Sequence, residues 1–133
     1  MGGGGFSMEP GNPLLDDHVL DLAREARGRE RPRICFIATA SGDSPDYLAS
    51  FYAAFARRAE ATHLALFRRT VDDIEGLLLD QDVVYVGGGN TENMLAIWRV
   101  HGVDEILREA GEAGVVLCGS SAGMNCWFEA SVT

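Results

Sequence analysis

The chain has 133 residues, a hydrophobic fraction of 47% and a formal net charge of −9, values typical of one folded, acidic domain. The charge excludes an ordinary nucleic-acid-binding protein, because no basic patch is present to replace the counterions of phosphates. No apolar run approaches the ~20 residues that span a bilayer. Because the first residues lack a basic segment followed by an apolar one, we expect no secretory signal. We therefore expect neither a nucleic-acid nor a membrane partner.

In chain order, the pattern of apolar residues predicts helices alternating with short strands. The first half comprises a helix opened by Asn12-Pro13 and ended at Gly28, a strand over 33–38, a helix opened by Ser44-Pro45, and a strand over 63–67. The second half comprises a short helix from a Thr70 cap to Leu79, a strand over 83–86, a helix over 93–110 broken near Gly102, and a strand over 115–118. Strands of this kind predict a mostly parallel α/β sheet with helices on both faces.

The cysteines and basic residues limit the available chemistry. Cys35, Cys118 and Cys126 all lie in apolar surroundings, so we expect reduced, buried thiols in a cytoplasmic protein. All eleven basic residues are arginine, so this sequence offers no Ser–Lys dyad and no P-loop or Schiff-base lysine. No histidine pair has metal-ligand spacing, and we expect neither a metal nor a cofactor.

The segment after the last predicted strand has the pattern of a nucleophile elbow. Residues 119–123 read Gly-Ser-Ser-Ala-Gly, preceded by the apolar run 115–118 and followed by a plausible helix over 124–129. A strand, a sharp Gly-x-Ser-x-Gly turn and a helix together raise the serine above the sheet edge. Ser121 is therefore the candidate nucleophile, with the N–H of Ala122 as one oxyanion donor; a plain Gly/Ser turn is the alternative.

A second glycine-rich turn follows the predicted strand 83–86. Because Gly87, Gly88 and Gly89 lack Cβ atoms, their backbone N–H groups can approach a ligand closely. Either Gly88 or Gly89 is expected to supply the second oxyanion donor. Asn90 or Thr91 is expected to cap the next helix and also to contact the substrate.

The sequence contains no convincing base for a serine nucleophile. His18 lies within a predicted helix, His63 opens a predicted strand, and His101 lies at a predicted helix break. Glu129 is eight residues beyond Ser121, which is about 12 Å along a helix. We expect these side chains to be surface or capping groups, so the chain alone is predicted to be almost inert.

Three ordered motifs resemble peptidase E, the aspartyl dipeptidase family related to cyanophycinase. They are residues 3–8 (GGGFSM), 85–91 (YVGGGNT) and 119–128 (GSSAGMNCWF), and residues 37–41 with the nearby Tyr47 also fit. The resemblance covers nearly the whole chain and implies a class I glutamine amidotransferase-like, flavodoxin-like fold.

What the resemblance implies for function is specific. Family members hydrolyse Asp-X dipeptides through an acyl-enzyme, which makes Ser121 the match for the nucleophile. Ala122 and the Gly88–Gly89 turn match the oxyanion donors, and Asn90 and Thr91 match the substrate-side motif.

The resemblance also implies that residues 1–133 are the N-terminal portion of a longer peptidase domain, truncated at both ends. Family members are nearly twice as long, and their catalytic acid and histidine follow the elbow. Missing strands expose apolar faces and unpaired sheet edges. We therefore expect a homo-oligomer or pairing with the missing C-terminal half, besides a small peptide substrate.

Two other functions are compatible with the same motifs. An α/β-hydrolase esterase also has an elbow, although its oxyanion loop commonly reads His-Gly-Gly-Gly rather than the Gly-Gly-Gly-Asn of residues 87–90. A non-catalytic binding module of glutamine amidotransferase-like fold would explain the missing base.

Overall fold

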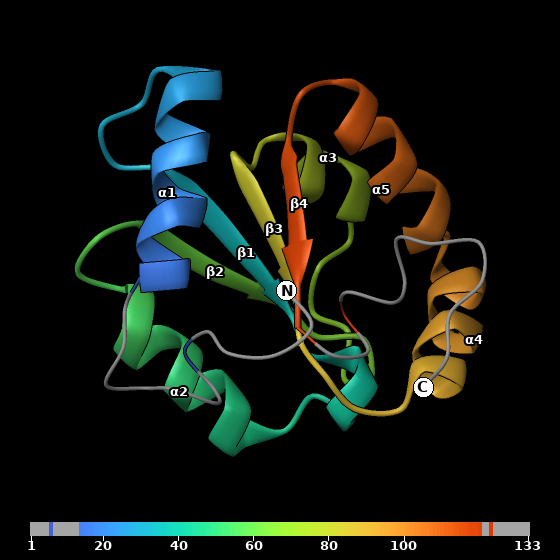
Figure 1. Ribbon diagram of the computed structural model, residues 1–133. Helices are drawn as coiled ribbons and strands as arrows, with labels where there is room; N and C mark the ends of the chain where they lie inside the picture. Colours follow the sequence, from blue (N-terminus) through green and yellow to red (C-terminus); the bar gives the residue numbers. More distant parts are fainter. Residues whose placement is uncertain (1–5, 7–13, 121–122, 124–133) are drawn as a thin grey trace.

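The computed structural model describes residue 6, residues 14–120 and residue 123. Within these residues a four-stranded parallel sheet has the strand order β2-β1-β3-β4 (Figure 1). Its strands are β1 (Arg33–Ile37), β2 (Glu60–Leu64), β3 (Val83–Val86) and β4 (Val116–Gly119). The predicted parallel α/β sheet is confirmed, and the strand order is that of the flavodoxin-like fold.

Helices cover both faces of this sheet, as the apolar pattern predicted (Figure 1). The α-helices within the described residues are α1 (Leu14–Arg27), α2 (Pro45–Phe55), α3 (Ile74–Leu79), α4 (Thr91–His101) and α5 (Val103–Glu112), with a short 3-10 helix, η1 (Thr39–Ser41), after β1. Helices α1 and α2 lie on one face, and α3, α4 and α5 lie on the other.

Alternation along the two central strands builds a core on each side of the sheet. In β1, Ile34 and Phe36 face the aromatic core beneath α1 and α2, whereas Cys35 and Ile37 face the aliphatic core beneath α3 to α5. β3 alternates in the same way along its length. Every residue of β3 is buried, as expected for a central parallel strand.

Most predicted element boundaries are close to the observed ones, and β3 matches its prediction. α1 ends before Gly28, whose φ is +72°, and the break between α4 and α5 falls at Gly102, whose φ is +73°. Both glycines adopt the left-handed conformation that commonly ends a helix. The helix predicted over 124–129 lies outside the described residues.

Two predicted boundaries were wrong. β2 was predicted at 63–67, but it spans Glu60–Leu64 and pairs in register with β1 from Arg33↔Glu60 onward. β2 is an edge strand with polar, partly exposed residues, so its first residues do not form the apolar run by which a buried strand is recognised. The short helix α3 is capped by Asp73, whose carboxylate accepts the Gly76 N–H at 2.9 Å, rather than by Thr70.

Candidate active site

The two glycine-rich turns lie side by side at the carboxyl edge of the sheet. β3 and β4 are adjacent parallel strands, and their last residues pair as Val86↔Gly119. Each turn begins immediately after its strand, so both project from the same edge. This is the edge at which ligands bind in open α/β sheets.

The turn after β3 is built tightly enough to require its glycines. A Cβ on Gly87 would lie 2.8 Å from the Phe36 ring, and a Cβ on Gly89 would lie 2.1 Å from the Ala40 carbonyl oxygen. Gly89 also has a φ of +145°, which side chains rarely permit. Asn90 then donates its backbone N–H to the same Ala40 carbonyl at 2.8 Å, which anchors the turn to the loop after β1.

Asn90 is the N-cap of α4, which confirms the first of the two predicted caps, Asn90 and Thr91. Its Oδ1 accepts the Asn93 N–H at 2.9 Å, and Thr91 is the first residue of the helix. Gly89 and Asn90 are both exposed, whereas Gly88 and Thr91 are half-buried. The turn is therefore rigid but open on its outer side.

The described residues of the predicted elbow, Gly119, Ser120 and Gly123, pack directly against the end of β3. A Cβ on Gly123 would lie 1.9 Å from the Val86 carbonyl oxygen, and a Cβ on Gly119 would lie 2.4 Å from the Gly123 carbonyl oxygen. Ser120 donates its N–H to the Val86 carbonyl at 3.2 Å, and Gly123 donates its N–H to the Ser120 carbonyl at 2.9 Å. The chain thus reverses within a few residues, where both motif glycines are sterically required.

Ser121 and Ala122 lie outside the described residues, so their predicted roles stay predictions. The residues on either side, Ser120 and Gly123, define where the turn begins and ends.

The two candidate glycine donors differ in their hydrogen bonds. The Gly88 N–H donates to the Tyr47 hydroxyl at 3.0 Å, so that group is already used. The Gly89 N–H donates to no acceptor among the residues that the structure describes. The geometry therefore favours Gly89 over Gly88 as a free donor at this edge.

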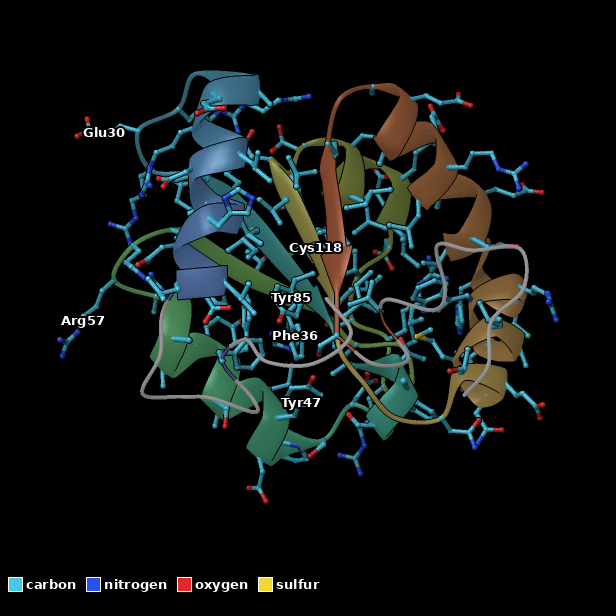
Figure 2. All side chains as sticks on the ribbon, in the orientation of Figure 1. Glu30, Phe36, Tyr47, Arg57, Tyr85 and Cys118 are labelled. Carbon is cyan, nitrogen blue, oxygen red and sulfur yellow. The ribbon has the colours of Figure 1, made fainter. Side chains whose placement is uncertain are left out.

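Two tyrosines lie at the junction of the turns, and Figure 2 shows Tyr47 and Tyr85 together with Phe36 near the carboxyl ends of the strands. The Tyr47 hydroxyl lies 3.5 Å from Ser120 Oγ, so it contacts both turns. Tyr85 Oη is buried without a hydrogen-bond partner among the described residues. Burial raises the pKa of the Tyr85 hydroxyl strongly. The nearby Ser120 side chain lowers that pKa slightly, although the two groups do not form a hydrogen bond.

Another contact fixes the loop between β1 and α2. Trp98 of α4 donates its Nε1–H to the Thr39 hydroxyl at 3.1 Å, and both residues are buried. This bond joins η1 to α4, and η1 in turn supports the glycine turn through Ala40. Sequence patterns did not indicate it, because the partners are 59 residues apart.

Comparison with known proteins agrees with this arrangement. The sequence model of peptidase family S51 matches residues 1–133. The chain belongs to peptidase family S51. It is 52% identical over 134 residues to an uncharacterized peptidase, YgaJ, from Bacillus subtilis (strain 168), covering 100% of this chain and 56% of that protein.

A solved structure is also similar to this S51 chain. It is the crystal structure of a "Putative Peptidase E Protein" from Listeria monocytogenes EGD-e, with a TM-score of 0.61 and 26% sequence identity to this chain. The match covers 78% of this chain and 54% of the other. The S51 chain therefore spans about half the length of the proteins to which it is similar.

No histidine in the described part of the S51 chain lies at the two turns. His18 is exposed on α1, and His63 on the outer strand β2 bonds the Tyr52 hydroxyl through Nδ1 at 2.6 Å. His101 is the last residue of α4, and its Nδ1 lies 3.3 Å from Nη1 of Arg69. These positions agree with the predicted surface and capping roles; Glu129 lies outside the described residues.

Residues 14–120, with residues 6 and 123, contain neither a cluster of potential metal ligands nor a helix that could span a membrane. No group of three or more His, Cys, Asp or Glu side chains gathers within them to hold an ion. None of their helices has the length and apolar character needed to cross a bilayer. Cys35 and Cys118 are free thiols; Cys35 is buried as expected, whereas Cys118 is half-buried. Loss of solvation around each sulfur raises its pKa to about 12.

Proposed function

We propose that the protein is a serine peptidase of the peptidase E type, which hydrolyses Asp-X dipeptides through an acyl-enzyme on Ser121. The observation that carries this proposal is the junction of the two turns. The described residues of the Gly-x-Ser-x-Gly segment, Gly119, Ser120 and Gly123, pack against the end of β3. The turn that follows β3 carries the exposed Gly89, whose N–H has no acceptor among the described residues. Membership of family S51 supports the same class of reaction.

The proposed reaction uses the elbow in the way of other serine hydrolases. Ser121 Oγ attacks the peptide carbonyl carbon as a base removes its proton, and the carbonyl oxygen becomes an oxyanion. The N–H groups of Ala122 and Gly89 would hold that oxyanion. The C–N bond then breaks, the leaving amine takes the proton, and water releases the aspartyl product in a second, similar step.

The base and its orienting acid are assigned, within this proposal, to the part of the relatives' length that this chain does not match. His63 lies on β2, the sheet edge opposite β4, His101 ends α4 at the far end from the turn, and His18 is exposed on α1. Asn90 and Thr91 remain the proposed substrate contacts at the start of α4, where a helix N-terminus favours the negative charge of a peptide carboxylate.

The proposal is tested with a fluorophosphonate probe and a substrate panel on the full gene product. We expect one probe molecule per chain on the peptide containing Ser121, located by mass spectrometry, and hydrolysis of Asp-X dipeptides. Hydrolysis of short p-nitrophenyl esters with no dipeptide cleavage would indicate the esterase. Absence of labelling would favour the non-catalytic module.

Pairing of the chain through its β4 side is part of the same proposal. β4 is the edge of the described sheet, its Val116, Leu117 and Cys118 are only half-buried, and the α1 residue Leu14 is 71% exposed. An apolar strand edge of this kind favours association. Light scattering of the 133-residue chain is expected to show dimers or larger species, and a monodisperse monomer would contradict this.

A further inference from the structure

Tyr47 is seated between the aromatic core and the glycine turn. It lies in the first turn of α2, which is capped by Ser44, and its ring packs edge-on against Phe36 with centroids 4.9 Å apart. A Cβ on Gly87 would lie 2.8 Å from this ring. The absence of a side chain at residue 87 therefore lets the tyrosine reach the edge of the sheet.

The Tyr47 hydroxyl contacts both halves of the candidate site. It accepts the Gly88 N–H at 3.0 Å and lies 3.5 Å from Ser120 Oγ, one residue before the proposed nucleophile. A phenol has one proton to donate and two lone pairs to accept. Accepting the Gly88 N–H uses one lone pair, so the hydroxyl can hold the glycine turn and the elbow side at the same time.

The bond to Gly88 also determines which amide can serve the reaction. An N–H that points at a tyrosine oxygen is not aimed at a developing oxyanion. The peptide of Gly88 is held by Tyr47, and Gly89 is held against the Ala40 carbonyl. With both restraints in place, the Gly89 N–H is the turn's donor without an acceptor in the described chain.

We infer that Tyr47 is a positioning residue for the proposed reaction: its hydroxyl orients the glycine turn and ties it to the elbow. The inference rests on the proposed function, because it concerns the oxyanion donors of that reaction. Tyr47 acts through Gly88 and Ser120 rather than on the substrate. Its hydroxyl therefore contributes to turnover more than to substrate binding.

The test is Tyr47→Phe in the full gene product, which removes the hydroxyl and keeps the ring. We expect kcat for an Asp-X dipeptide to fall about 10- to 100-fold, because small errors in positioning catalytic groups cost this much. KM is expected to change less than about threefold, since binding contacts are untouched. The rate of fluorophosphonate labelling is expected to fall in parallel with kcat.

Tyr52→Phe is the matched control. It removes a hydroxyl from the same helix, but that hydroxyl bonds His63 on the far edge of the sheet. We expect its kcat and labelling rate to equal those of the unchanged protein. Thermal unfolding of both variants, and rates normalised to titrated active sites, separate a loss of fold from a loss of positioning.

A second variant tests the elbow side of the contact independently. Ser120→Ala is expected to lower kcat by about 3- to 10-fold, and the double variant with Tyr47→Phe is expected to be no slower than Tyr47→Phe alone. Fully multiplicative effects, or a Tyr47→Phe protein as active as Tyr52→Phe, would overturn the inference. Failure of the unchanged protein to label at Ser121 would instead overturn the proposed function.

Discussion

Replacing Ser121 with alanine in the full gene product is expected to lower kcat for an Asp-X dipeptide by about 10⁵- to 10⁶-fold. The alanine removes the oxygen that would form the acyl-enzyme, and neither oxyanion donor can replace it. The residual rate over water, about 10³- to 10⁴-fold, would come from the backbone N–H groups and substrate binding. Steady-state release of the leaving amino acid measures the loss.

The neighbouring serine provides the internal comparison. Ser120 is 2% exposed, and its backbone N–H bonds to β3, so its side chain faces inward. Ser120→Ala is therefore expected to keep activity within about tenfold of the unchanged protein. If the two substitutions had reversed effects, the nucleophile would be Ser120 and the register of the elbow would be wrong.

The sequence indicated that the two turns could be neighbours, but it left their strand order open. Short buried strands and the glycines after them predicted that both turns follow the carboxyl ends of parallel strands. The order of those strands depends on tertiary packing, and the observed β1-β3-β4 order brings the turns together. The expectation that the two strands lie side by side is thus confirmed.

Tyr47 shows what the sequence could not reveal. Its spacing with Phe51 fits one face of a helix, which predicts a core residue and says nothing of its hydroxyl. The hydroxyl meets Gly88, 41 residues later, only because the Tyr47 ring packs on Phe36 of β1 and Gly87 leaves room. That contact also distinguishes the N–H of Gly88, which is bonded, from the N–H of Gly89. The sequence alone gives no reason to prefer either residue as the oxyanion donor.

Replacing Gly123 with alanine is expected to lower the rate of acylation about 100- to 1000-fold. The new Cβ would be placed 1.9 Å from the Val86 carbonyl oxygen and 2.5 Å from its carbon, both of which belong to a central strand. Backbone atoms cannot move aside as a flexible side chain can. The elbow must shift instead, which separates the serine side of the site from the Gly89 turn.

Gly111→Ala in α5 is the matched control for this substitution. Its Cβ would lie 2.9 Å from a terminal methyl of Leu117, a half-buried side chain that can rotate away. We expect the Gly111→Ala protein to acylate at nearly the normal rate. A difference in acylation rate between the two variants therefore measures the effect of the collision with the Val86 backbone, because both variants add one methyl group near β4.

Stopped-flow labelling with the fluorophosphonate distinguishes a displaced elbow from an unfolded protein. A folded Gly123→Ala protein that still labels at Ser121, but slowly, would retain the nucleophile and lose its alignment with the oxyanion donors. Labelling at the normal rate would mean that the elbow does not depend on its contact with Val86. The packing of Gly123 against β3 would then have no bearing on catalysis, and the elbow would form without its second motif glycine.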